Sequence, residues 1–237
     1  MSEYRQILTQ TLDECGIAYD ESMIKALCRY RDLLLEWNAV MNLTALTEPR
    51  DIALKHFADC LSVLKVCDIP QGAAVIDVGT GAGFPGLVLK IARPDIRLTL
   101  LDSLSKRLSF LDAVCDELKI PDAVTVHSRA EDGARGERRD SFDIAVSRAV
   151  APLNVLCEYC LPYIRPQGRF IALKGKGAEE ELTAAQGALQ TLNGRVTAHH
   201  LFTLAEAGER SVIEITKTAP TPQIYPRRSK LIKSKPL

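Results

Sequence analysis

The chain has 237 residues, of which 46% are hydrophobic, and its 30 basic residues balance its 30 acidic residues. This length suits one large α/β domain with a full core, or one domain with an added helical cap. A formal net charge of zero argues against a protein that coats nucleic acid by bulk attraction. Without a long apolar run or a signal-peptide pattern, and with seven scattered cysteines, we expect a cytoplasmic protein with no membrane span and with reduced thiols.

The first seventy residues are predicted to be helical. Apolar residues recur at helical spacing over 4–15, 22–37 and 51–66. Ser22 and Asp51 stand at the starts of the second and third of these segments, where we expect them to act as N-caps. No strand pattern competes in this part of the chain. The helical spacing therefore predicts a helical extension over residues 1–70.

After residue 70 the pattern changes to short apolar runs that alternate with helical stretches. Strands are predicted near 73–79, 96–102, 123–127, 142–147 and 168–173. Such a βαβα order predicts a parallel sheet with helices on both faces. Two further runs, near 194–204 and 210–218, are predicted to form a hairpin that closes one edge of the sheet. The α/β domain is therefore predicted to span 71–219, followed by a basic tail over 220–237.

The segment "AAVIDVGTGAGFPG", residues 73–86, begins as a strand and then becomes rich in glycine. Its turn contains Gly79, Gly81, Gly83 and Gly86. In open α/β sheets, ligands bind beyond the carboxyl ends of the strands, and glycines there let a ligand approach the backbone. The next predicted strand ends about twenty residues later at Asp102, where a carboxylate can bind ribose hydroxyls. Asp102 could alternatively cap the following helix.

Two nucleoside ligands compete for this turn, a dinucleotide and S-adenosylmethionine. The letters "GTGAGFPG" formally contain the dinucleotide pattern G-x-G-x-x-G. However, Pro85 lacks an N–H group near the place where a pyrophosphate would bind, and Asp77 carries negative charge just before the turn. A carboxylate disfavours phosphate and suits a cationic sulfonium or its amino group. The turn therefore favours S-adenosylmethionine.

Seven segments together resemble one known family. They are "WNAVMNLTAL", "KHFADCL", "AVIDVGTGAGFPG", "LTLLDSLSKRLSFL", "SRAE", "AVSRAVAPL" and "ALKGK", in this order along nearly the whole chain. They are similar to the bacterial 16S ribosomal RNA guanine-N7 methyltransferases, the RsmG or glucose-inhibited division protein B (GidB) family. The resemblance implies a Rossmann-like class I methyltransferase fold, with a seven-stranded, mostly parallel sheet and an N-terminal helical extension.

The same resemblance implies the positions that bind S-adenosylmethionine. They are Gly79, Gly81, Gly83, Phe84, Asp102, Ala130, Glu131 and Arg148. Gly81 and Gly83 would shape the turn, Asp102 would bind the ribose, and Ala130 with Glu131 would meet the adenine. Within "HFADC", Cys60 stands where the family usually has serine, while His56 and Asp59 match the family and, with Asn42, would pack the extension against the cleft.

Cations that could meet RNA lie in two places. Arg148 and Lys174 follow the fourth and fifth predicted strands, whose ends point into the cleft. We expect Arg148 to be the catalytic residue and Lys174 to contact RNA. In the tail, Arg227, Arg228 and Lys230 could bind the phosphate backbone, or this segment could be a solvated, frayed end.

No metal site is expected from the sequence. The motif "CEYC", Cys157 to Cys160, has metal-ligand spacing, but it lies in a helical pattern with a buried face and has no second pair. His199 and His200 lie in a strand pattern far from the glycine turn and are assigned an ordinary surface or half-buried role.

The chemistry of the target base agrees with the residues at the predicted cleft. Guanine N7 has a lone pair and no proton, so methyl transfer to it needs positioning and no general base. Adenine-amine enzymes usually have Asn/Asp-Pro-Pro-aromatic where this chain has "SRAVAP", and cytosine-C5 enzymes need a Pro-Cys pair that this chain lacks. The resemblance implies guanine-N7 methylation of small-subunit ribosomal RNA, free or in the assembling subunit, and we expect the protein to be a monomer. A methyltransferase for another RNA base or a small molecule, and a non-catalytic ribosome-binding protein, are the alternatives.

Overall fold

The computed structural model describes residues 3–237 and contains one seven-stranded sheet in the order β3-β2-β1-β4-β5-β7-β6. The strands are β1 (Ala74–Val78), β2 (Arg97–Asp102), β3 (Ala123–His127), β4 (Phe142–Arg148), β5 (Ile164–Lys174), β6 (Gly194–Thr203) and β7 (Glu209–Lys217). The first five strands pair in parallel, and β7 pairs antiparallel with both β5 and β6. The predicted mostly parallel α/β sheet and its edge hairpin are both confirmed.

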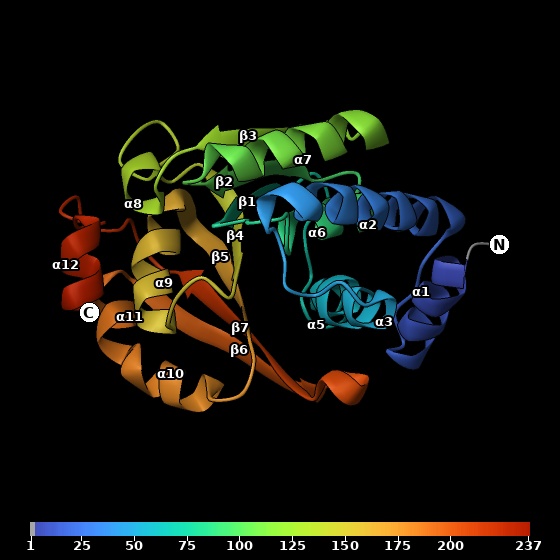
Figure 1. Cartoon of the computed structure of the whole chain (residues 1–237). Helices are drawn as coiled ribbons and strands as arrows, with labels where there is room; N and C mark the ends of the chain where they lie inside the picture. Colours follow the sequence, from blue (N-terminus) through green and yellow to red (C-terminus); the bar gives the residue numbers. More distant parts are fainter. Residues whose placement is uncertain (1–2) are drawn as a thin grey trace.

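Helices cover both faces of this sheet (Figure 1). Those of the N-terminal extension are α1 (Glu3–Glu14), α2 (Glu21–Met41), α3 (Pro49–Asp51), the π-helix η1 (Ile52–Ala58), α4 (Asp59–Leu61) and α5 (Val63–Val66). The others are α6 (Gly86–Ala92), α7 (Ser105–Leu118), α8 (Ala130–Gly133), α9 (Leu153–Cys160), α10 (Ala178–Ala184), α11 (Gln186–Thr191) and α12 (Ser229–Ser234), with short 3-10 turns η2 (Leu161–Tyr163) and η3 (Ala205–Ala207). Among the described residues, no helix is long and apolar enough to cross a membrane.

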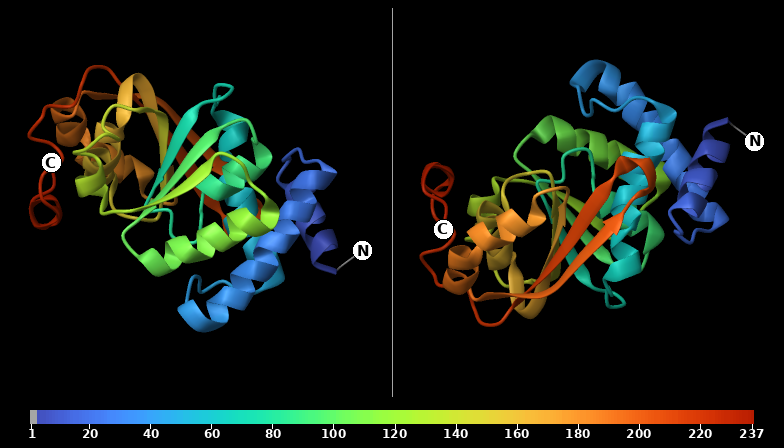
Figure 2. Two further views of the ribbon diagram at one scale, coloured as in Figure 1. Left: turned by 90° about the horizontal axis from the view of Figure 1, so that it is seen from above. Right: turned by 90° about the horizontal axis from the view of Figure 1, so that it is seen from below.

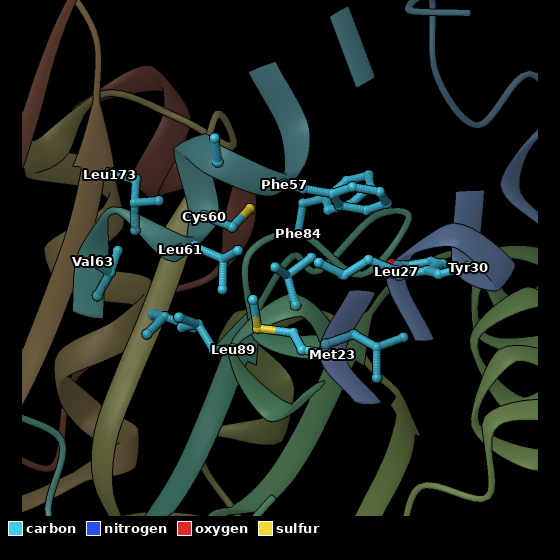
Figure 3. Close-up of a cluster of buried hydrophobic side chains, with 14 of the residues drawn as sticks. Met23, Leu27, Tyr30, Phe57, Cys60, Leu61, Val63, Phe84, Leu89 and Leu173 are labelled. Atoms are coloured by element: carbon cyan, nitrogen blue, oxygen red, sulfur yellow. The ribbon is translucent and has the colours of Figure 1, made fainter. Parts of the chain in front are cut away.

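The two faces of the sheet carry separate cores because successive strand residues point to opposite sides. In β1, Val75 belongs to the core under the extension, whereas Ile76 belongs to the core under α9 and α11. Side chains of α2, η1, α4 and α6 interleave in the first core, which Figure 3 shows in close-up. This core contains residues from both sides of residue 70, so the extension is packed against the rest of the protein. A domain boundary at that residue stays a prediction.

The extension begins its helices at positions other than those predicted. Asp20 caps α2, because its carboxylate accepts a hydrogen bond of 2.8 Å from the Met23 N–H, while Ser22 lies inside the helix and donates to Asp20. Asp51 is also not a cap, because its helix already begins at Pro49. The predicted single helix over 51–66 is interrupted by η1, a π-helical segment of a kind that is frequent at functional sites.

The C-terminal segment lies at the opposite end of the molecule from α1 (Figure 2). It is held by Arg139, which donates to the carbonyl oxygens of Tyr225 at 2.8 Å and Thr221 at 2.7 Å. Ile232 of α12 is fully buried in the second core. The tail is therefore a folded part of the structure, and the alternative of a frayed end is wrong.

Candidate cofactor and RNA site

A cavity of about 1350 Å³ opens at the carboxyl ends of β1, β2, β4 and β5. The extension contributes one wall through His56 and Asp59, and the tail contributes another through Ser229 and Lys233. Parallel strands bring their carboxyl ends to one edge of the sheet, so residues from distant parts of the sequence meet there. The predicted cleft is therefore present. It extends beyond the strand ends, because the extension and the tail add walls to it.

The glycine turn after β1 forms the floor of the cavity. Gly79, Gly81 and Gly83 have φ angles of +75°, +60° and +95°, a region that favours glycine. A side chain at Gly81 would project into open space, with no atom within 4 Å of its Cβ. Gly83 instead faces Tyr30 and Leu111, so this residue shapes the turn and does not line the cavity.

Asp77 is a buried carboxylate beneath this turn. Its Oδ2 accepts hydrogen bonds from Thr80 Oγ1 at 2.7 Å and from the Gly86 N–H at 2.8 Å. Its Oδ1 is buried and has no hydrogen-bond partner in the part of the chain that the structure describes. Burial raises the pKa of Asp77 to about 6, because removal from water disfavours the charged form. At neutral pH Asp77 is still largely charged and lies beneath the turn, although its side chain does not line the cavity.

Asp102 joins the ends of β1 and β2. Its Oδ2 accepts a hydrogen bond of 3.0 Å from the Gly81 N–H, and its Oδ1 accepts one of 2.9 Å from the Leu104 N–H. The N-cap position of α7 is Leu104 and not Asp102, so the alternative capping role is wrong. Arg107 at 3.4 Å is a third partner, which leaves acceptor capacity on the carboxylate for a ligand hydroxyl.

Ala130 and Glu131 line the cavity at the start of α8. Glu131 is 5% exposed, although its charged neighbours Arg129 and Asp132 are exposed. Tyr159 of α9 and Ser229 of the tail line the same end of the cavity. The end expected to bind adenine is thus enclosed by three separate segments of the chain.

Arg148, at the end of β4, occupies the centre of a buried polar network. Its Nη1 donates to Asp59 Oδ2 at 2.6 Å and to the Lys55 carbonyl oxygen at 2.8 Å. Asp59 Oδ1 also accepts a hydrogen bond of 2.7 Å from Arg210 Nε at the start of β7. One carboxylate therefore fixes two guanidinium groups from different strands and ties both to the extension.

An aromatic stack lies against this network. The rings of His56 and Phe84 are parallel within 15°, with centroids 4.3 Å apart, and the Arg148 guanidinium lies 5.2 Å from the Phe84 centroid. Arg148 can only donate, so His56 Nδ1, at 3.2 Å from Arg148 Nη2, is the acceptor, and His56 Nε2 donates to Thr44 Oγ1 at 2.9 Å. Burial, together with the charge of Arg148, lowers the pKa of His56 to about 3. His56 is therefore neutral and orients Arg148.

Lys174 lines the cavity but is engaged by the protein itself. Its Nζ donates to the Ala151 carbonyl oxygen at 2.8 Å and pairs with Glu181 Oε2 at 2.6 Å, and its side chain is 8% exposed. At most one N–H of its ammonium group remains for a ligand. The main role of Lys174 is therefore structural, because it holds the loop after β4 against α10.

The tail cations fall into two groups. Arg227 forms a buried pair with Glu158 of α9, with Nη2 2.6 Å from Oε2, and the Glu158 side chain is 1% exposed. The expected RNA contact of Arg227 does not agree with this placement, because its guanidinium anchors the tail internally. Arg228 and Lys230 are exposed, and so is Lys233, which lines the cavity.

The structure adds residues that sequence reasoning did not assign to the site. Arg210 and Lys233 lie at the cavity only because the hairpin and the tail fold back over the strand ends. Tyr30 of α2 donates to the Ala82 carbonyl oxygen and so fixes the glycine turn from the extension. Asn42, expected with His56 and Asp59, instead ends α2 and does not line the cavity. No local pattern in the sequence marks these contacts.

Comparison with known proteins agrees with this site. Residues 23–212 match the family model described as rRNA small subunit methyltransferase G. The chain is 43% identical to ribosomal RNA small subunit methyltransferase G of Clostridium perfringens strain SM101, over 99% of each chain. It is 46% identical to the protein of that name from Alkaliphilus oremlandii, over 96% of each chain.

Solved structures share the fold at low sequence identity. A 16S rRNA (adenine(1408)-N(1))-methyltransferase from Catenulisporales acidiphilia aligns with a TM-score of 0.52 at 14% identity, over 64% of this chain and 88% of that chain. TrmN from Thermus thermophilus aligns with a TM-score of 0.53 at 15% identity, over 70% of this chain and 53% of that chain. From the family match and the full-length relatives, we conclude that this chain belongs to the rRNA small subunit methyltransferase G family.

Proposed function

We propose that this protein methylates N7 of a guanine in small-subunit ribosomal RNA, with S-adenosylmethionine as the methyl donor. The observation that carries the proposal is Arg148, whose guanidinium is held in a fixed orientation and lies at the cavity beside the glycine turn. The chain also matches a family of ribosomal RNA methyltransferases. Family membership supports the reaction class and the RNA substrate. Guanine N7 is what the resemblance to this family implies, and the chemistry of the cavity agrees with it.

The residues of the cavity fit S-adenosylmethionine, which supplies an electrophilic methyl group on a cationic sulfur. Asp77, which is buried beneath the turn and outside the cavity lining, has an unpartnered oxygen and adds a negative charge that favours such a cation. Asp102 keeps acceptor capacity for ribose hydroxyls, and Gly81 leaves open space where a ligand can approach the backbone. A pyrophosphate would instead meet the charge of Asp77 and the missing N–H of Pro85.

Guanine N7 is an acceptor without a proton, so the protein has to position the base and need not remove a proton. The neutral His56 is not free to act as a general base, since both of its ring nitrogens are already used by Arg148 and Thr44. The task left to the chain is to hold the base so that N7 faces the methyl group. A fixed guanidinium suits this task because it is planar and rigid.

Arg148 provides donors for the neighbouring atom of guanine. Asp59, Lys55 and His56 use three of its five N–H groups, and the other two have no hydrogen-bond partner among residues 3–237. Guanine presents O6 as an acceptor beside N7, whereas adenine presents an amino donor at that position. Donation to O6 leaves N7 free and disfavours adenine, which gives the site its base selectivity.

Exposed cations around the cavity can bind the RNA backbone. Arg228, Lys230 and Lys233 lie on the tail, beyond the buried Arg227–Glu158 pair. Because the net charge of the chain is zero, attraction to RNA must come from such local groups. The proposed path therefore crosses the tail and enters the cavity toward Arg148, with Lys174 at its wall.

A methyl-transfer assay tests the proposal. Protein and S-adenosylmethionine with a tritiated methyl group are incubated with small-subunit RNA, with assembled subunits, with free mononucleotides, and with RNA transcribed with 7-deazaguanosine. We expect label in natural RNA or subunits and none in 7-deaza RNA, because that base lacks N7. Chain scission by borohydride and aniline, which cleave at N7-methylguanine, then locates the base.

Other outcomes correspond to the alternatives. Label in 7-deaza RNA would mean that another atom or base is methylated, and label in free mononucleotides alone would mean a small-molecule substrate. Binding of RNA and donor without any transfer would identify a non-catalytic ribosome-binding protein. The monomeric state and the cytoplasmic location stay predictions from the sequence.

A further inference from the structure

Away from the cavity, three potential metal ligands converge between the extension and the hairpin. Cys67 follows α5, His200 lies on β6, and Glu214 lies on β7. One ligand atom from each, the Cys67 Sγ, a His200 ring nitrogen and a Glu214 carboxylate oxygen, all lie within 4.8 Å of one another. Cys67 and Glu214 are buried, with 5% and 7% exposure, and the His200 side chain is 31% exposed.

From this geometry we propose that Cys67, His200 and Glu214 bind one zinc ion, with water in the fourth position. Sulfur, imidazole and carboxylate are the ligand types of zinc sites, and three protein ligands leave one tetrahedral position open. The partial exposure of His200 gives water access to that position. His200 Nε2 and Glu214 Oε1 are 3.2 Å apart, a separation that ligands of one ion can have after a small adjustment.

The charges around the cluster agree with a divalent ion. A thiolate and a carboxylate neutralise Zn²⁺, and the neutral imidazole of His200 adds no charge. Arg169 pairs with the other carboxylate oxygen, Glu214 Oε2, at 2.6 Å, and also donates to the Asp68 carbonyl oxygen. It therefore leaves Oε1, which faces His200, available to an ion, and it orients the carboxylate, as groups around zinc ligands commonly do.

Such an ion would connect two parts of the chain that also meet at the cavity. Cys67 lies in the link from the extension to β1, and the hairpin that carries His200 and Glu214 also carries Arg210, which pairs with Asp59. The ion would therefore hold the hairpin against the extension some distance from the methyl-transfer site. We expect it to stabilise the fold without taking part in the reaction.

Cobalt titration tests this site on the whole, chelator-treated protein. We expect a thiolate-to-cobalt charge-transfer band that saturates at one equivalent and is displaced by zinc, and a higher melting temperature with zinc. Cys67→Ser should abolish the band, and His200→Gln should weaken cobalt affinity by about 100-fold or more. One matched control is Cys115→Ser, at a half-buried cysteine outside the cluster. The other is His199→Gln, because the His199 Nε2 contacts Ser211 Oγ at 2.7 Å and no residue of the cluster.

His200 is half-buried at the edge strand, so its substitution leaves the core intact and keeps the test valid if Cys67→Ser fails to fold. A band that is absent in the unaltered protein would overturn the proposal. So would a titration that His200→Gln leaves unchanged, or one that the control substitutions alter equally. In those cases the three residues form only an internal hydrogen-bonded cluster with Arg169.

Discussion

Replacing Gly81 with valine should weaken donor binding while the fold persists. The residue has a φ of +60°, and its Cβ would meet no atom within 4 Å, because it faces the open cavity. A valine there places a branched side chain where the ligand must approach the backbone. Overpacking of this kind costs about 1–3 kcal/mol, so donor affinity should fall by up to roughly 100-fold.

The same substitution at Gly72 separates this effect from backbone strain. Gly72 has a φ of +69°, and a Cβ there would likewise meet no atom within 4 Å, but the residue precedes β1 and lies away from the cavity. A β-branched residue at positive φ costs about 1–3 kcal/mol at either position. Both variants should therefore lose similar stability, and Gly81→Val alone should lose the ligand.

Titration calorimetry with S-adenosylmethionine and urea unfolding of both variants measure the two effects separately. We expect Gly72→Val to bind the donor as the unaltered protein does. Unchanged affinity in Gly81→Val would refute the assignment of the glycine turn to the donor. Equal loss of affinity in both variants would mean that strain, and not occupation of the cavity, explains the result.

Four further perturbations address the carboxylate beneath the turn, the fixed guanidinium, the buried tail pair and the exposed tail cations. Because the pKa of Asp77 is raised to about 6, donor affinity should fall as the pH drops below 6 and this residue takes up a proton. Calorimetry from pH 5 to 8 should show this dependence in the unaltered protein and not in Asp77→Asn. Arg148→Ala should reduce single-turnover methylation by roughly 100-fold or more with little loss of RNA affinity, and an equal loss of both would argue against a role in orienting the base. Arg227→Gln leaves Glu158 buried without its partner and should destabilise the fold by about 3–5 kcal/mol in urea unfolding, whereas a neutral effect would mean that the pair is not buried in solution. Glutamine at three exposed tail cations should lower the salt slope of RNA binding by about 2–3 and leave the fold intact, and an unchanged slope would exclude the tail from the RNA path. These three are Arg228, Lys230 and Lys233.

The sequence by itself determined the sheet and the position of the ligand turn. The short apolar runs of strands and the glycines that follow them are local features of the sequence. For this reason β1 and β2 begin and end within one residue of their predicted bounds. Asp77, Asp102 and the glycine turn could be assigned because each lies at, or directly after, the carboxyl end of a strand. Helix starts were less accurate, since Asp20 and Ser22 are both good capping residues and only the backbone geometry selects Asp20.

The tertiary structure alone decided which charged groups are free and which are already paired. Arg227 and Arg228 are adjacent and chemically identical in the sequence, but folding of the tail onto α9 buries the first against Glu158 and leaves the second exposed. Arg148 and Arg210 likewise meet at Asp59 only because β4, β7 and the extension pack together. An ion pair between residues far apart in the chain depends on how whole elements pack, and no short stretch of sequence encodes that packing.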